Sequence, residues 1–173
     1  MSGFKIQEVA QIIRDAGGQV VGRTRLQKIA YLFFATGLDD SFRFAYKHYG
    51  PFSEDLASSA KIGALVGEFE ERQEQASWGG TYSTYSANTA SQVSADSARQ
   101  ELARLCSSVD SVVLELAATA VFLSHDGYPD PWQETANRKP DKSTADRVAK
   151  AKSLLSDLAK IQTPVELPAA AVA

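Results

Sequence analysis

The chain has 173 residues, a length that suits one domain with a sizeable buried core. Its hydrophobic content of 44% and its charged content of 23% are those of an ordinary globular protein. The formal net charge of −3 disfavours a generally nucleic-acid-binding surface, although a local basic patch stays open.

The single cysteine, Cys106, cannot form an internal disulfide, which is typical of a reducing cytoplasm. It lies in a helical run, so we expect a buried thiol rather than a reactive one. The first residues are amphipathic and do not resemble a secretory signal. The longest apolar run, 112–123, contains Glu115 and is too short to span a bilayer. We therefore expect a cytoplasmic protein that does not bind membranes.

The first half predicts the order helix, helix, strand, helix and hairpin. Helical spacing of apolar residues predicts a helix over 6–16 and a second helix over 24–36, with Thr24 as its N-cap. Alternation of aromatic and polar residues predicts a strand over 42–47. A third helix is expected to begin at Ser53 and to fade in the charged residues near 70, before a hairpin over 77–86 with Gly79-Gly80 in its turn.

The second half predicts further helices. Residues 86–97 are small and polar and favour a flexible loop, and helices are expected around 102–105 and 112–121. Asp130-Pro131 begins a short helix, and Thr144 caps the last one. We predict one helical domain over 1–162 and a disordered tail over 163–173, where prolines replace any periodic pattern.

Three cations, Arg23, Arg25 and Lys28, lie at the head of the second predicted helix. They form either the solvated face of an amphipathic helix or a docking patch for phosphate or an acidic partner. Cations at a helix N-terminus oppose the helix dipole by a few tenths of a kcal/mol, which gives some weight to the docking patch.

The two histidines, His48 and His125, could form a metal site with Asp126 and Asp130. Their spacing matches no known zinc-binding pattern, and no nucleophile stands in a recognisable turn. We therefore expect no metal, no cofactor and no catalytic site. A metal-dependent hydrolase through the two histidines is the least favoured alternative.

The predicted order of elements is close to that of a winged helix, whose third helix would enter the major groove of DNA. Here that helix begins with Ser53, Glu54 and Asp55 and offers only Lys61 as an early cation. Recognition helices read bases largely with their N-terminal residues, where two carboxylates would face phosphates. The expected hairpin tip also has no lysine or arginine. Nucleic-acid binding is therefore possible but disfavoured.

Trp132 stands among the cations Arg138 and Lys139. It is either a tryptophan that fixes a short helix to the core or an exposed aromatic anchor for a partner. Glu115 lies in an apolar helix, either at its surface edge or in a buried pair that Arg138 or Arg147 could complete.

Two short motifs in the first half resemble those of the Panacea domain family. One joins a leucine-glutamine-lysine helix to a following tyrosine, and the other is a glycine-proline turn that opens a helix; the matching residues are Leu26, Gln27, Lys28, Tyr31, Tyr49, Gly50 and Pro51. The resemblance implies a mainly helical domain with a small sheet, from bacteria or phages, and most of these residues are expected to form the fold. Many members of the family are antitoxins that bind toxins, and some are proteolytic adaptors.

We therefore predict a mainly α, single-domain helical bundle with a small antiparallel β-sheet and a winged-helix-like order of elements. The predicted function is a non-enzymatic protein–protein interaction module, either an antitoxin or an adaptor. Its candidate partner-binding residues are Arg23, Arg25, Lys28, Trp132, Arg138 and Lys139. The alternative is a winged-helix transcriptional regulator that binds DNA through Arg23, Arg25 and Lys28.

Overall fold

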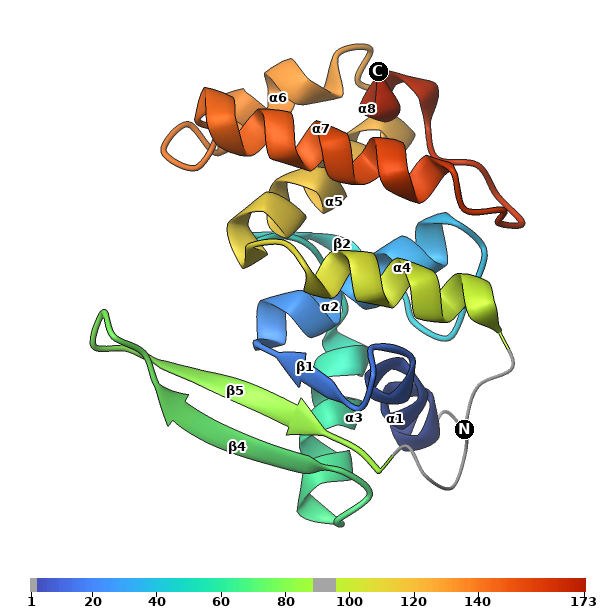
Figure 1. Cartoon of the computed structure of the whole chain (residues 1–173), viewed down its shortest axis with the longest axis vertical. Helices are drawn as coiled ribbons and strands as arrows, with labels where there is room; N and C mark the ends of the chain where they lie inside the picture. Colours follow the sequence, from blue (N-terminus) through green and yellow to red (C-terminus); the bar gives the residue numbers. More distant parts are fainter. Residues whose placement is uncertain (1–2, 89–95) are drawn as a thin grey trace.

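The computed structural model describes residues 3–88 and 96–173, which fold into helices and two small antiparallel sheets (Figure 1). The helices are α1 (Ile6–Asp15), α2 (Arg23–Ala35), α3 (Glu54–Leu65), α4 (Ser97–Ser107), α5 (Ser111–His125), α6 (Pro131–Arg138), α7 (Ala145–Ala159) and α8 (Ala169–Val172). The strands are β1 (Gln19–Val21), β2 (Ala45–Lys47), β3 (Gly50–Phe52), β4 (Glu70–Gln75) and β5 (Thr81–Ser86). The predicted mainly α fold with a small antiparallel sheet is confirmed.

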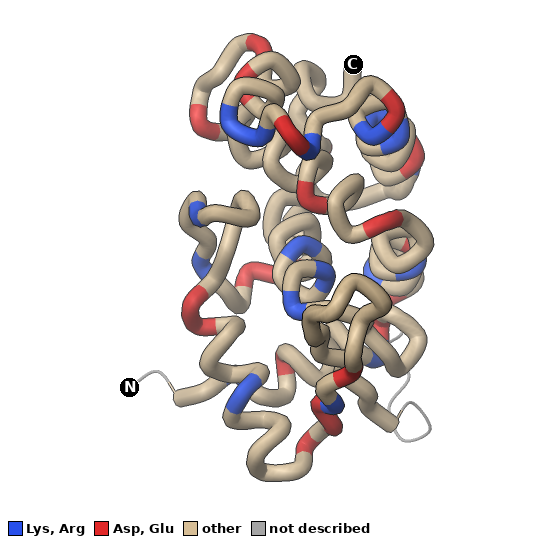
Figure 2. Tube along the Cα trace, turned by 90° about the vertical axis from the view of Figure 1, so that its left-hand side faces the viewer, with Lys and Arg blue, Asp and Glu red and all other residues tan. Residues whose placement is uncertain are grey.

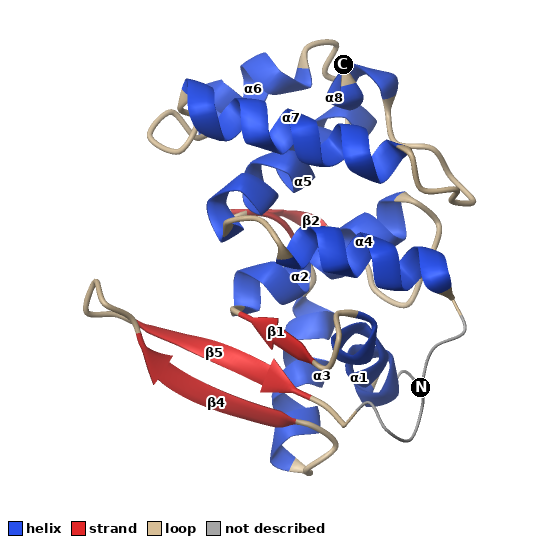
Figure 3. Ribbon diagram, in the orientation of Figure 1, coloured by secondary structure: helices blue, strands red, loops and turns tan. Residues whose placement is uncertain are grey.

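The first half has a winged-helix-like order of elements, as expected. Its helices α1, α2 and α3 are followed by the hairpin β4–β5, and β1 pairs with β5, so the sheet order is β1-β5-β4 (Figure 3). The hairpin β2–β3 forms a separate sheet between α2 and α3 in the chain. We call β4, β5 and the turn that joins them the wing. It extends to one side of the molecule (Figure 1).

Most of the predicted helix starts are capped by side chains. The Ser53 hydroxyl accepts the Leu56 N–H of α3 at 3.1 Å, and Asp130 accepts the Gln133 N–H of α6 at 3.1 Å. Such bonds satisfy N–H groups that have no partner inside the helix. The cap at Thr24 is wrong, because α2 begins one residue earlier and follows Gly22, which has no side chain.

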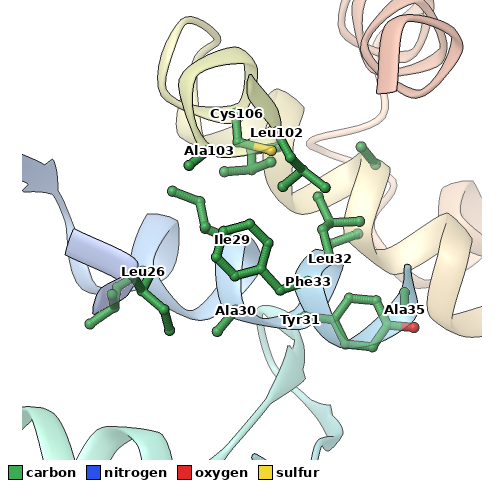
Figure 4. Close-up of a cluster of buried hydrophobic side chains, with 14 of the residues drawn as sticks. Leu26, Ile29, Ala30, Tyr31, Leu32, Phe33, Ala35, Leu102, Ala103 and Cys106 are labelled. Atoms are coloured by element: carbon green, nitrogen blue, oxygen red, sulfur yellow. The ribbon is translucent and has the colours of Figure 1, made fainter. Parts of the chain in front are cut away.

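The core lies around α2 and α5, which are both buried on most sides. Figure 4 shows Ile29 and Phe33 of α2 beside Leu102 and Cys106 of α4, and all four are fully buried. The predicted buried thiol is thus confirmed, and burial raises the pKa of Cys106 to about 12. Apolar residues lie on most sides of α2, and this distribution predicts a helix that is covered on several faces.

Three strands differ from the sequence prediction. Residues expected to end the third helix form β4, and Gly50-Pro51, expected only to break a strand, begins β3. The predicted strand over 42–47 is limited to its last three residues. All side chains of β4 are charged or polar, so its strand conformation comes from pairing with β5 rather than from an apolar face.

The tail over 163–173, predicted to be disordered, packs against the helices. The Trp132 indole N–H donates to the backbone oxygen of Ala171 at 2.9 Å, and the Ala171 side chain is fully buried in α8. The predicted loop over 86–97 lies mostly outside the described residues. In residues 3–88 and 96–173, no helix has the length and apolar character needed to cross a bilayer.

Candidate functional site

The two sequence motifs of the first half contact each other directly. The Gln27 side chain of α2 forms two hydrogen bonds with the backbone of Ser53: its oxygen accepts the N–H at 2.8 Å, and its amide group donates to the C=O at 3.0 Å. One residue along, the Lys28 ammonium donates to the Pro51 oxygen at 2.8 Å. All of these groups are buried. The motif residues therefore hold hairpin β2–β3 and the start of α3 against α2.

A buried carboxylate lies on the other side of hairpin β2–β3. Glu115 of α5 is paired with Lys139 at 2.8 Å and with Lys142 at 2.9 Å. Lys139 also donates to the backbone oxygen of His48 at 2.9 Å. Glu115 thus belongs to a buried pair, but lysines rather than Arg138 or Arg147 complete it. Because a buried charge is costly unless it is paired, these contacts make the position of the hairpin specific.

Burial disfavours the charged form of Lys28. Its side chain is completely buried, and burial lowers the pKa of Lys28 to about 7, although the nearby Glu115 carboxylate opposes that change. A residue without exposed surface cannot contact a partner. The prediction that Lys28 belongs to a docking patch is therefore wrong, and Lys139, also buried, is excluded from the partner-binding set for the same reason.

The two arginines of the predicted patch have different surroundings. The Arg25 guanidinium donates to the backbone oxygens of Cys106 at 2.7 Å and Val109 at 2.8 Å, and burial lowers the pKa of Arg25. Arg25 therefore holds the end of α4 rather than a partner. Arg23 is largely exposed and pairs with Glu71 of the wing at 3.0 Å. The three cations do not form one surface.

The Trp132 region is also occupied by internal contacts. Trp132 is buried, with its indole N–H bonded to the tail, so the exposed aromatic anchor is wrong. Arg138 stacks over the ring of Tyr46 at 4.7 Å and pairs with Glu134 at 2.7 Å. The hydrogen bond that Arg138 donates to the Glu134 carboxylate raises the pKa of Arg138. This side chain fixes α6 to hairpin β2–β3.

A groove with a volume of about 760 Å³ lies between α2, α3 and the wing. We call it the wing groove. Just over half of its lining is apolar or aromatic: Leu26, Tyr49, Phe52, Ala57, Ala60, Ala64, Leu65 and Tyr85. The polar and charged lining residues are Arg23, Thr24, Gln27, Lys28, Lys61, Glu71 and Gln73. Concave apolar surfaces of this size are the usual sites of binding.

Large apolar side chains are exposed around the wing groove. Leu65 and Tyr49, which line it, are 72% and 56% exposed, and Val66 follows Leu65 at 64%. A second concavity of about 450 Å³ shares Arg23 with the groove and includes Trp78, which is 75% exposed. Clustered exposed apolar side chains mark interaction surfaces.

The charges at the wing groove are mixed, because its lining includes Arg23 and Lys61 as well as Glu71, which pairs with Arg23. Strand β4 carries Glu70, Glu71 and Glu74 against the single cation Arg72, which pairs with Glu70 at 3.5 Å and Glu74 at 3.8 Å. Figure 2 shows acidic and basic positions interspersed along the chain rather than gathered into one basic face. A DNA-binding wing would present cations at this place.

The two histidines do not meet in a metal site. His48 contributes its backbone oxygen to the Lys139 contact, and His125 lies at the C-terminal end of α5. Among the described residues, no group of three or more histidine, cysteine, aspartate or glutamate side chains could hold a metal ion.

The sequence analysis did not predict the wing groove, because helical spacing alone does not say which apolar residues of a helix are buried. The same spacing fits an exposed end of a helix, and the structure leaves Leu65 outside. A usable signal was present in β4, since a run of charged residues cannot cover an apolar helix end. Recognising this strand would have exposed the apolar end of α3.

No protein-family model matches the chain, and searches among curated proteins and among solved structures give no match either.

Proposed function

We propose that the protein is a non-enzymatic interaction module, an antitoxin or adaptor, that docks a partner protein in the wing groove. The observation that carries this proposal is the groove itself, which is just over half apolar or aromatic in its lining, about 760 Å³ in volume and bordered by exposed Leu65 and Tyr49. The resemblance of the motifs to the Panacea domain family supports the same class of function. The mechanism is occlusion of the partner's surface.

The chemistry of the groove defines the segment that fits it. A partner would insert apolar side chains between α2 and α3, as an amphipathic helix or an extended segment does in a hydrophobic groove. The exposed leucine and tyrosine at the rim have the character of residues that supply most of the binding energy at such contacts.

The test is photocrosslinking in the native host with a benzophenone amino acid at Leu65, and with the same amino acid at exposed Ala170 in α8 as the control. We expect one protein to be crosslinked from Leu65 and not from Ala170. That protein, once purified, should bind the wild type with a fixed stoichiometry and lose at least about tenfold in affinity for Leu65→Asp. Equal binding of Leu65→Asp and wild type would contradict the proposal.

DNA binding is the second candidate, because α1–α3 and the sheet order β1-β5-β4 have the order of a winged helix. The acidic start of α3 and the glutamates of β4 oppose it. Fluorescence anisotropy with duplex DNA at about 50 mM salt, where non-specific contacts are strongest, distinguishes the two. Saturable binding that weakens for Arg23→Glu would favour the regulator, and we expect none.

A further inference from the structure

Another concavity, separate from the two described above, lies at the C-terminal ends of α2 and α5, and aromatic rings form most of its wall. Its volume is about 360 Å³, and we call it the aromatic dish. Tyr31 and Phe34 come from α2, Phe44 from the segment before β2, and Phe122 from α5. Figure 4 shows Tyr31 beside Ala35, the last residue of α2. This site is distinct from the wing groove, which lies along the first part of α2.

The four rings contact one another around Tyr31. Their centroids lie 5.3 Å (Tyr31–Phe44), 6.0 Å (Tyr31–Phe122), 6.4 Å (Tyr31–Phe34) and 5.8 Å (Phe34–Phe44) apart, and their planes are tilted or perpendicular rather than stacked. Phe34, Phe44 and Phe122 keep exposed surface beside the concavity, whereas Tyr31 is buried. Phe34 is 37% exposed, so the dish is open to ligands from solution.

The electrostatic surroundings of the dish favour a cation. Asp126 lies in its lining, and in the described part of the chain no hydrogen bond or ion pair engages its carboxylate. The C-terminal ends of α2 and α5, which carry partial negative charge, both reach the dish through Ala35 and His125. Among the described residues that line it, there is no lysine or arginine.

Ring faces carry a negative quadrupole and attract cations within about 6 Å, most strongly when the cation is poorly hydrated. An ordinary ammonium group would need several hydrogen-bond acceptors, whereas a quaternary trimethylammonium group has no N–H and needs none. One carboxylate at the rim and several rings in the wall match the second kind of cation. We propose that the aromatic dish binds a quaternary trimethylammonium group, with the rings around the methyl groups and the Asp126 carboxylate balancing the charge.

The trimethylammonium group could belong to a free small molecule or to a trimethylated lysine side chain. Choline, its uncharged isostere 3,3-dimethylbutan-1-ol and a short peptide with trimethyllysine are the probes, titrated by NMR against the full chain. We expect saturable shifts with choline at least about tenfold tighter than with the isostere, because only the charge differs between them. Tighter binding of the peptide than of choline would assign the source to a protein side chain, and the reverse order to a free molecule.

Two variants connect binding to the dish. Phe34→Ala should weaken choline binding at least about fivefold, because one exposed ring is lost, and Asp126→Asn should weaken it about threefold or more. Asp40→Asn, at an exposed carboxylate outside the lining, is the matched control and should bind as the wild type does. Equal affinities for choline and its isostere, absence of saturable binding, or full binding by Phe34→Ala would each overturn the proposal.

Discussion

Lys28 is a charged side chain in the middle of the core, and its ammonium group donates a hydrogen bond to the Pro51 oxygen. Removing an ammonium group from water is expensive, and the protein reduces this cost by lowering the pKa of the group. Near neutral pH the side chain is therefore close to the point where it loses its proton. The stability of the fold should depend on that proton.

The expected dependence follows from the two proton affinities. Lys28 has a pKa of about 7 when folded and 10.5 as the ordinary value, so between these pH values the unfolded chain binds one more proton than the folded chain. Raising the pH then stabilises the folded state, by at most about 1.4 kcal/mol per pH unit. In urea unfolding, the free energy of unfolding of wild type minus that of Lys28→Met should rise from pH 7 to pH 9.

The matched control is Lys61→Met, which removes an exposed lysine of α3. Titration of tyrosines and of Cys106 cancels in both differences, because these groups are unchanged. The Lys61 difference should stay flat with pH. A flat Lys28 difference would mean that the buried ammonium keeps its ordinary proton affinity.

Gly50 occupies a position in the motif Tyr49-Gly50-Pro51 where a side chain does not fit. Its φ is +87°, and a Cβ at this position would lie 2.5 Å from the Thr119 hydroxyl oxygen. We expect Gly50→Ala to lower the free energy of unfolding by roughly 2–5 kcal/mol, from the left-handed conformation and the contact together. Thermal or urea unfolding measures it.

Gly79→Ala separates the two causes. Gly79 has a φ of +95°, but no described atom lies within 4 Å of its Cβ position, so only the conformational cost of about 1–2 kcal/mol applies. Thr119→Ala should recover part of the loss when combined with Gly50→Ala. If both glycine variants lost equal stability, the close approach to Thr119 would have no energetic role.

At the scale of elements, the short helix α8 depends entirely on the helices it covers. A helix of four residues has no stability of its own, so its position comes from buried Ala171 and from the hydrogen bond of Trp132. Introducing a carboxylate at the buried position should therefore release α8 rather than bury a charge.

We expect Ala171→Asp to expose Trp132, while Ala170→Asp at the neighbouring exposed position should leave it covered. Both changes are made in a Trp78→Phe background, so that fluorescence reports Trp132 alone. Its emission should move to longer wavelength only in Ala171→Asp. An unchanged spectrum there would show that α8 does not cover the indole.

The elements that could be predicted are those with a local signal. Apolar spacing located α1, α2, α5 and α7, and cap residues located the starts of α3 and α6. Strand β4 could not be predicted, because its charged residues carry no alternation and only its partner β5 makes it a strand. That α8 is ordered could not be predicted either, since its contact with Trp132 joins distant parts of the chain.

The candidate sites show the same division. The motif residues Gln27 and Gly50 were recognised as fold-forming, and the structure gives them that role through Ser53 and Thr119. The wing groove and the aromatic dish were not predicted, because each joins segments that lie far apart in the sequence. Charge alone was misleading for Lys28, which lies inside the core.

At the scale of the whole molecule, buried polar contacts connect the first half of the chain, from α1 to β5, to the helices of the second half. Glu115 of α5 and Lys139 hold hairpin β2–β3 from one side, and Lys28 and Gln27 of α2 hold it from the other. Neither half can release the hairpin without leaving buried polar groups unpaired.

We therefore expect the described parts of the chain to unfold together. In urea, the fluorescence of Trp132 in the Trp78→Phe variant reports the second half, and far-ultraviolet circular dichroism reports all helices. The two midpoints should coincide, as they do in two-state unfolding. Separate midpoints would show that the halves are independent units.

The buried position of Cys106 has a practical consequence. A fully covered thiol with a pKa of about 12 offers almost no thiolate to alkylating reagents while the protein is folded. Its rate of alkylation therefore measures how often the core opens, without any engineered probe. A cysteine introduced on the surface, such as Leu65→Cys, could also carry a dye or spin label selectively, with the native thiol left in place.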